Sequence, residues 1–319
     1  MSSLALRGPY WVTVRQYRRT LWLAGAVVVL ALAVIGGLRI WDLQTPDVHL
    51  EGGFTHPSND NRGYGTLRMA MEYFSMAMVL LPLLVGAFVA GPLIARELES
   101  GTYKLSLTQS ISPARWLGSK LRTATAAALA TTLLLMTVYA LGWARAGGSS
   151  RLHWSDRGSY EATGTALLGY VLLAVAVGAL VGQLIRRTLV AMAVTGGVVG
   201  LVLLILGALR WDFLPVTTIT GPAVENASVL AMPEDGLIMG QGLISTFGNR
   251  LPGWFCFPEG APAGACRTDE PIAAQYLDYH PRSHFWPTQL IETGIVLALA
   301  ALAALALFAA FRVLRARHP

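Results

Sequence analysis

The sequence predicts an all-α membrane protein that crosses the bilayer six times, and three observations carry this prediction. The chain contains apolar runs of about twenty residues or more, the length that a helix needs to cross the hydrocarbon core. Its 319 residues are 54% hydrophobic and 13% charged, whereas soluble domains average about 25% charged residues. The basic residues flank the apolar runs, as orientation signals do. The formal net charge of +6 therefore indicates membrane topology and does not favour nucleic-acid binding.

The apolar runs define the spans, and a basic segment precedes the first of them. The predicted spans are 21–40, 74–95, 121–143, 162–184, 189–209 and 287–311, and turn-forming residues fill the loop 41–70. In segment 1–20, aromatic and apolar residues from Tyr10 to Tyr17 recur at helical spacing among four arginines. This pattern predicts an amphipathic helix on the inner membrane surface; a frayed basic tail is the alternative. No cleavable signal peptide is expected, because the first span is too long for one.

Charge placement orients the spans. With both termini in the cytoplasm, the arginines and lysines are densest on the inner side, as the positive-inside rule requires. All acidic residues except Glu97 and Glu99 then fall on the outer side. We therefore expect a multi-pass plasma-membrane protein with a basic tail after its sixth span.

Segment 210–286 is predicted to form an ordered extracellular cap between the fifth and sixth spans. Its stretches 229–232 and 236–247 are apolar enough to dip back towards the bilayer. Cys256 and Cys266 also lie in this segment. In an oxidising compartment they would form a disulfide that stabilises the cap by about 2–3 kcal/mol; two unpaired thiols are the alternative.

Two pairs of glycines mark close helix packing in the fourth and fifth spans. Gly178 and Gly182 are four residues apart, as are Gly196 and Gly200. Small residues at this spacing let helix backbones approach each other. The pattern fits packing within one chain or an interface between subunits, and the sequence does not choose between them.

No site for energy conversion or catalysis is visible in the sequence. A phosphate-binding G-x-x-x-x-G-K-[ST] motif and an H-E-x-x-H zinc motif are both absent. His280 and His284 are four residues apart, but Pro281 breaks a helix between them, so we expect polar contacts there and no zinc site. No Asp, Glu or Lys lies near the middle of a predicted span, which argues against an ion-coupled carrier. Glu72 and Glu292 near the outer ends are either boundary residues or part of an outer vestibule.

The two inner acids, Glu97 and Glu99, are in an unfavourable position. They lie at the C-terminal end of the second span, where the helix dipole and anionic lipid each disfavour a carboxylate by about 0.3–1 kcal/mol. A cation should offset them. That cation is either internal (Arg96, Lys104 or Arg115) or part of a basic groove on a soluble partner protein.

At these residues the sequence resembles a known family. Residues 91–102 (GPLIARELESGT), Gln109, Arg115–Leu117 and Lys120 resemble the ABC-2 type transporter permeases of bacterial ABC exporters, most closely an actinobacterial subgroup. Residues 279–292 (YHPRSHFWPTQLIE) resemble the start of the last span in that subgroup. His284 is a departure, because arginine is expected there. The two stretches cover under a fifth of the chain, and the six-span topology matches throughout.

The resemblance implies a six-helix permease of the type V exporter kind, which dimerises with a second copy or a paralogue. It implies no bound cofactor, with ATP and Mg²⁺ held by a separate ATP-binding subunit. It also implies short re-entrant helices before the last span and a coupling element after the second span. Within segment 96–120, which we call the coupling segment, the residues expected to dock on that subunit are Arg96, Glu97, Glu99, Gly101, Thr102, Arg115 and Trp116.

The predicted function is therefore the membrane subunit of an ATP-driven exporter with no ATPase of its own. Apolar and threonine side chains in the spans favour an amphipathic or lipid-like cargo, such as a drug or antibiotic. Two other classes are weighed against it: a membrane-embedded enzyme, for which no nucleophile or metal set is visible, and a sensor or scaffold whose extracellular cap binds a ligand without transport.

Overall fold

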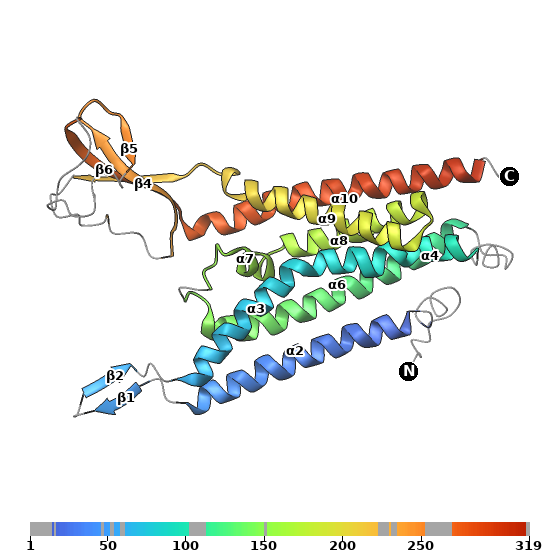
Figure 1. The fold of residues 1–319 in the computed structure, drawn as a ribbon, viewed down its shortest axis with the longest axis horizontal. Helices are drawn as coiled ribbons and strands as arrows, with labels where there is room; N and C mark the ends of the chain where they lie inside the picture. The colour runs from blue at the N-terminus through green and yellow to red at the C-terminus, as the bar shows by residue number, and fades with distance from the viewer. Residues whose placement is uncertain are drawn as a thin grey trace, which may run out of the picture. The chain divides into compact units, whose positions relative to one another are not determined.

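The computed structural model confirms the predicted fold class: six helices long and apolar enough to cross a membrane, with a small antiparallel sheet between the fifth and sixth (Figure 1). The structure describes residues 15, 17–45, 48–51, 54–57, 61–101, 113–149, 152–222, 230, 235–252 and 270–316. They form two compact units. The helical unit contains residues 1–210 and 289–319, and the sheet unit contains residues 211–288.

The first three spans are formed by α2 (Arg18–Gln44), by α3 (Arg62–Leu84) with its continuations, and by α6 (Pro113–Ala146). A π-helical turn, η1 (Val85–Ala90), joins α3 to α4 (Gly91–Ser100). The last three spans are α8 (Ala166–Ile185), α9 (Thr188–Leu209) and α10 (Phe285–Ala316), and a short helix, α7 (Arg157–Thr163), precedes α8.

Local sequence explains where several helices begin and end. The Asn61 side chain accepts a hydrogen bond from the Tyr64 N–H at 2.8 Å and so caps α3. Gly101 ends α4 in the left-handed conformation (φ 70°), which glycine adopts at little cost. Pro113 begins α6, where the missing N–H of proline costs no helical hydrogen bond.

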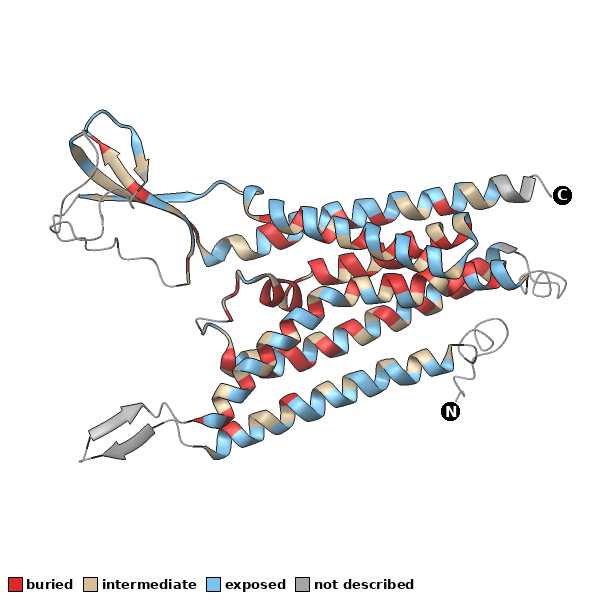
Figure 2. Ribbon diagram, in the orientation of Figure 1, coloured by how far each residue is buried: buried red, intermediate tan, exposed pale blue. Residues whose placement is uncertain are grey.

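Burial differs strongly among the spans (Figure 2). In their most apolar windows, α8 is 72% buried, the α3–η1–α4 span is 50% buried and α2 only 6%. The second span therefore packs inside the bundle. Helix α8 is the central helix, whereas α2 is the least buried of the six spans.

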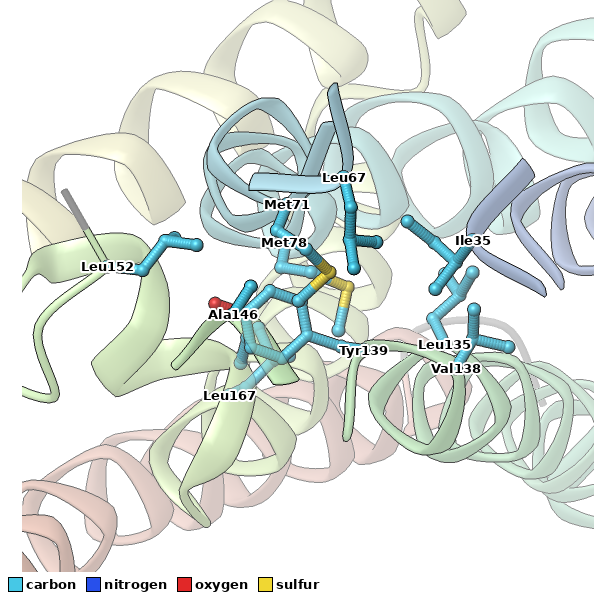
Figure 3. Close-up of a cluster of buried hydrophobic side chains, with 11 residues drawn as sticks. Ile35, Leu67, Met71, Met78, Leu135, Val138, Tyr139, Ala146, Leu152 and Leu167 are labelled. Atoms are coloured by element: carbon cyan, nitrogen blue, oxygen red, sulfur yellow. The ribbon is translucent and has the colours of Figure 1, made fainter. Parts of the chain in front are cut away.

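Among the apolar clusters of the helical unit, two involve α2 or α4. The larger joins α2, α3, α6 and α8 around Ile35, Met71, Tyr139 and Leu167 (Figure 3). The second packs Leu93 and Ile94 of α4 against α6, α8 and α10. This second cluster places the start of the coupling segment on the buried side of the bundle.

The second span begins earlier than predicted. Helix α3 starts at Arg62, inside the expected loop 41–70, because Leu67 and Met71 are fully buried although charged residues interrupt the apolar run around them. The same loop contains a hairpin of β1 (Val48–Glu51) and β2 (Phe54–Pro57).

The sheet unit contains four strands in the order β3-β6-β4-β5: Thr217–Pro222, Ile272–His280, Leu237–Ser245 and Arg250–Pro252. Residues 237–245, considered as part of a re-entrant segment, therefore form a strand whose backbone pairs with its neighbours on both sides. The re-entrant segment was expected because residues 236–247 are largely apolar. Cys256 and Cys266 lie outside the described residues, so their predicted disulfide stays a prediction.

Candidate functional site

The coupling segment begins at the end of α4 and runs into the start of α6. On α4, Arg96 and Glu99 are exposed, whereas Glu97, which lies between them in the sequence, is buried. On α6, Arg115 is exposed and Trp116 is half-buried. Thr102, the remaining predicted contact residue besides Gly101, lies outside the described residues.

Glu97 forms a buried ion pair with Lys120, whose ammonium group donates to its Oε1 atom. The two side chains are 10% and 4% exposed, respectively. The Lys120 Nζ atom also lies 5.6 Å from the centre of the Tyr17 ring and 5.4 Å from that of Trp116. A lysine is tolerated away from water where a carboxylate and aromatic faces surround it. We call these four residues, Tyr17, Glu97, Trp116 and Lys120, the Lys120 site.

Tyr17 fastens the start of α2 to this site. Its hydroxyl donates to the Leu93 carbonyl of α4 at 3.3 Å. Burial, aided by the nearby Glu97 carboxylate, raises the pKa of the Tyr17 phenol well above its ordinary value. The phenol therefore stays protonated and keeps its role as a donor.

Glu99 has a partner on a different helix. Its Oε2 atom accepts the Thr188 N–H at 2.9 Å and also the Thr188 hydroxyl, so the carboxylate caps the first turn of α9. A carboxylate is favoured at a helix N-terminus by the orphan N–H groups and the dipole. The same acid that is unfavourable at the end of α4 is thus favourable at the start of α9.

Both inner acids therefore have partners within the chain. Glu97 pairs with Lys120, which was not among the expected cations, and Glu99 accepts hydrogen bonds from Thr188, which is not a cation. The signal that could have found one of them is Lys120 itself. A lysine that begins an otherwise apolar span needs a counter-ion, and Glu97 is the buried acid at the same membrane end. The contact between Glu99 and Thr188 joins residues 89 apart and has no comparable signal in the sequence.

A second buried charge network lies at the other end of the helical unit and was not predicted. Arg210, at the end of α9, forms ion pairs with Glu161 of α7 and Glu292 of α10. All three side chains are at most 2% exposed. The Arg210 guanidinium also stacks 3.7 Å above the Tyr160 ring, a geometry that suits its flat, delocalised charge. We call Tyr160, Glu161, Tyr170, Arg210 and Glu292 the Arg210 cluster.

The two acids of the Arg210 cluster are not equivalent. Glu292 accepts two hydrogen bonds of 2.9 Å from the Arg210 fork and a third, of 2.6 Å, from the Tyr170 hydroxyl. Glu161 accepts one bond from Arg210, and its Oε2 atom has no hydrogen-bond partner among the described residues. Burial raises the pKa of Glu161 to about 7 against the opposing effect of Arg210. Glu292 is therefore the acid whose oxygens both have hydrogen-bond partners, and Glu161 is the acid whose pKa is raised.

Amide hydrogen bonds extend this network along α10. Gln289 donates to the Tyr160 carbonyl at 2.7 Å and accepts the Ala166 N–H at 2.9 Å. Together with the ion pairs of Arg210, these hydrogen bonds join α7, α8, α9 and α10.

Glu292 was expected to be a boundary or vestibule residue. Glu161 and Arg210 carried no such expectation, because each stands at a predicted span boundary, where charged residues are common.

Comparison with known protein families gives a match over more than half of the chain. The model of the ABC-2 membrane transporter related family matches residues 23–210, which contain the first five spans and the coupling segment. The chain belongs to that family. No curated protein and no solved structure gives a significant match. The resemblance identified from the sequence is thereby confirmed at the level of the family.

Members of the ABC-2 transporter-related family are non-catalytic transmembrane subunits, and family membership implies an ATP-binding partner. Within this ABC-2 chain, the four predicted packing glycines face the second span. A Cβ atom on Gly178 would lie 2.5 Å from the Ala90 Cβ, and one on Gly182 would lie 2.8 Å from the Gly91 carbonyl oxygen. Gly196 and Gly200 face α3 and η1 less closely. These contacts fix α8 against the α4 end of the coupling segment.

The histidine pair of this ABC-2 chain lies in the sheet unit. The His280 and His284 Nδ1 atoms are 3.0 Å apart, and the His280 Nε2 atom lies 3.0 Å from the Trp211 carbonyl oxygen. Because the carbonyl can only accept, Nε2 carries the His280 proton and the His284 Nδ1–H donates to His280. Burial lowers the pKa of His280, which favours this neutral form. Among the residues with described positions, no group of three or more metal-binding side chains occurs.

Proposed function

We propose that this chain is the permease subunit of an ATP-driven ABC exporter in the plasma membrane, with both termini in the cytoplasm. It would dimerise, with itself or with a paralogue, and move an amphipathic or lipid-like cargo such as a drug or antibiotic. ATP and Mg²⁺ would be bound by the partner subunit. The observation that supports this proposal best is the double attachment of the coupling segment, through Glu97 to α6 and through Glu99 to α9.

The double attachment suits the transmission of force. A push on the coupling segment would reach α6 through the Glu97–Lys120 ion pair and α9 through the Glu99 cap. Exposed Arg96 and Arg115 at its two ends offer guanidinium groups that can pair bidentately with carboxylates of a soluble partner. In this scheme Arg96 and Arg115 bind the ATP-binding subunit, whereas Glu97 acts inside the permease as a positioning residue.

The second and fifth spans are proposed to flank the cargo path at the dimer axis. The second span is interrupted by the π-helical turn η1, a feature that is frequent at functional sites. Gly86 in this turn packs against Thr195 and Val199 of α9. A span with a built-in irregularity, held against α9 by small residues, can change its packing with less disruption than a regular helix.

Co-purification tests the proposal. The tagged permease is isolated from its native membrane as wild type, as the double variant Arg96→Glu with Arg115→Glu, and as the control Arg62→Glu. Arg62 is exposed in the first turn of α3, where a glutamate suits the helix dipole. We expect an ATP-binding subunit with the wild type and the control, and its loss with the double variant.

A third variant separates binding from coupling. Glu97→Gln with Lys120→Met removes both charges of the pair, so the partner should still co-purify while cargo no longer stimulates ATP hydrolysis. If wild-type permease brings down no ATP-binding subunit, the exporter proposal fails. A sensor or scaffold, with the separate sheet unit as its ligand-binding part, would then explain the protein better.

A further inference from the structure

An apolar groove runs along the inner side of α2. It has a volume of about 350 Å³ and lies between α2, the α3–η1 region and α6. Leu21 and Val27 line it from α2, Val85 and Phe88 from η1, and Ala127 from α6. At one end of the groove, Ile35 of the larger apolar cluster packs α2 against α3 and α6. Between Tyr17, which donates a hydrogen bond to Leu93 of α4, and the buried Ile35, α2 borders this hollow.

The threonines in this groove contribute little polarity. Thr123, Thr131 and Thr132 all line it, and each hydroxyl donates to the carbonyl four residues earlier in α6, at 2.8 Å. Their hydrogen-bonding capacity as donors is therefore used within the helix. The long wall of the groove suits a hydrocarbon and offers no donor to a polar ligand.

Polar groups gather at one end only, at the Lys120 site. Tyr17 and Lys120 both line the groove there. Arg18 and Arg19 are exposed in the first turn of α2, next to the lining residues Tyr17 and Thr20. The charge at this rim is positive, because Glu97 balances Lys120 and leaves the two arginines in excess. An anionic group is therefore favoured at this end and a neutral chain along the rest.

The groove is longer than the hydrocarbon half of one membrane leaflet. Its α6 wall runs from Lys120 to Leu135, fifteen residues, or about 22 Å at a rise of about 1.5 Å per residue. Half of a hydrocarbon core of about 30 Å is about 15 Å, so the groove is long enough to hold an acyl chain of one leaflet. Because α2 and α6 are both membrane spans, the polar end lies at the depth of lipid headgroups.

We propose that this groove binds one alkyl chain of an anionic amphiphile, with its headgroup beside Arg18 and Arg19 and its first methylenes at the Lys120 site. The bound chain fills the hollow between α2 and α6 and contacts Lys120, the residue that links α6 to the coupling segment through Glu97. The groove shares the second span with the proposed cargo path, but it lies on the side of that span that faces α2 and α6, whereas the cargo path is proposed on the side that faces α9. It requires only the permease, so its test does not involve an ATP-binding subunit.

Native mass spectrometry of the purified permease tests the site, with phosphatidylglycerol, phosphatidylcholine of the same chains, and palmitate as probes. We expect the wild type to retain phosphatidylglycerol at least tenfold more than phosphatidylcholine. Palmitate retained as well as phosphatidylglycerol would identify free fatty acids as a second source of the same chemistry. Equal retention of the neutral and the anionic phospholipid would overturn the proposal.

Variants with a matched control locate the site. Ala127→Phe fills the groove from α6, whereas Ala126→Phe places the same ring on the exposed side of that helix. We expect at least a tenfold loss of phosphatidylglycerol for the first and no loss for the second. If Ala127→Phe unfolds the protein, Ala24→Phe fills the groove from α2, with Ala26→Phe as its exposed control.

Charge removal tests the headgroup position. Arg18→Gln with Arg19→Gln should abolish the preference for the anionic lipid while neutral lipid binding stays unchanged. Unchanged lipid retention in both filled variants would disprove the site. A change in the ratio of monomer to dimer, in place of lipid loss, would show that a second copy of the chain covers the groove and would also overturn the proposal.

Discussion

The Lys120 site and the Arg210 cluster differ in almost every physical respect. The Arg210 cluster joins helices far apart in sequence, contains two acids for one base, and is at most 2% exposed at its three charged side chains. The Lys120 site is a balanced pair beside an open groove and next to the exposed arginines of the coupling segment. One network is enclosed by four helices, whereas two members of the other, Tyr17 and Lys120, line an open groove.

This difference separates a structural role from a transmitting one. A buried charge without its partner costs several kcal/mol, so a fully enclosed network fixes the arrangement of its helices. A balanced pair near an open surface costs less to rearrange and can respond to what binds beside it. The comparison predicts that the Arg210 cluster controls stability, and that the Lys120 site controls coupling.

The largest effect is expected from the substitution Arg210→Met. It leaves two carboxylates facing each other without a counter-ion, and we expect a loss of about 3–5 kcal/mol in the free energy of unfolding. Thermal unfolding in detergent measures it. The triple variant with Glu161→Gln and Glu292→Gln should recover most of the loss, and failure to recover would show that the charges are not its cause.

A smaller effect is expected from Glu97→Ala, about 2–4 kcal/mol, because Lys120 keeps its aromatic neighbours and lies nearer to water. A double-mutant cycle with Lys120→Met measures the coupling of the pair, which should exceed about 1 kcal/mol. The double variant should fold nearly as well as the wild type and yet fail in transport. Full transport by the double variant would remove the distinction drawn between the two networks.

The pH dependence of stability should further distinguish the Arg210 cluster from the Lys120 site. The folded pKa of Glu161, about 7, lies above its ordinary value of 4.5, so between these values the folded chain holds a proton that the unfolded chain has lost. The free energy of unfolding should therefore fall as pH rises through this window, by about 1–3 kcal/mol. The charged groups that act on Glu161 are Arg210, Glu292 and Arg157.

Melting curves at pH 5.5 and pH 8 measure this dependence, with Glu161→Gln as the matched variant. The glutamine resembles the protonated acid, so it should remove the pH effect and keep the stability of the acidic form. An undiminished pH effect in this variant would assign the titration to another group.

The smallest effect is expected from Glu99→Gln. The exposed cap of α9 loses its charge but keeps an acceptor for the Thr188 N–H, so stability should fall by about 0.3–1 kcal/mol. Hydrogen exchange of the first α9 amides should quicken, while the Arg210 cluster region stays unchanged. Equal exchange at both ends would contradict the local role of this cap.

Most of the membrane topology follows directly from the sequence. Apolar runs of bilayer length and flanking basic residues predict all six spans, and the sixth is visible although a long polar segment precedes it. The early start of α3 was missed because a helix that extends past the membrane loses its apolar signal while Leu67 and Met71 remain buried. The strand at 237–245 was missed because an apolar run of that length has no unique periodicity.

The coupling segment shows the same division. Its residues and its place between two spans were evident from the motif, and the need for a cation near Glu97 followed from elementary electrostatics. Which cation it is depends on how α4 and α6 pack: the candidates Arg96, Lys104 and Arg115 are close to Glu97 in sequence, and Lys120 was not among them. The structure instead pairs Glu97 with Lys120, whose ammonium group also lies near the rings of Tyr17 and Trp116.

The sequence by itself determined the class of protein, the number of spans and the family, because bilayer thickness and charge orientation act on each segment locally. Only the tertiary structure decided which charges meet. Glu161, Arg210 and Glu292 lie 49 and 82 residues apart and each resembles an ordinary boundary residue in isolation. Their pairing depends on the packing of α7, α9 and α10, and helix packing is fixed by surfaces that no single segment contains.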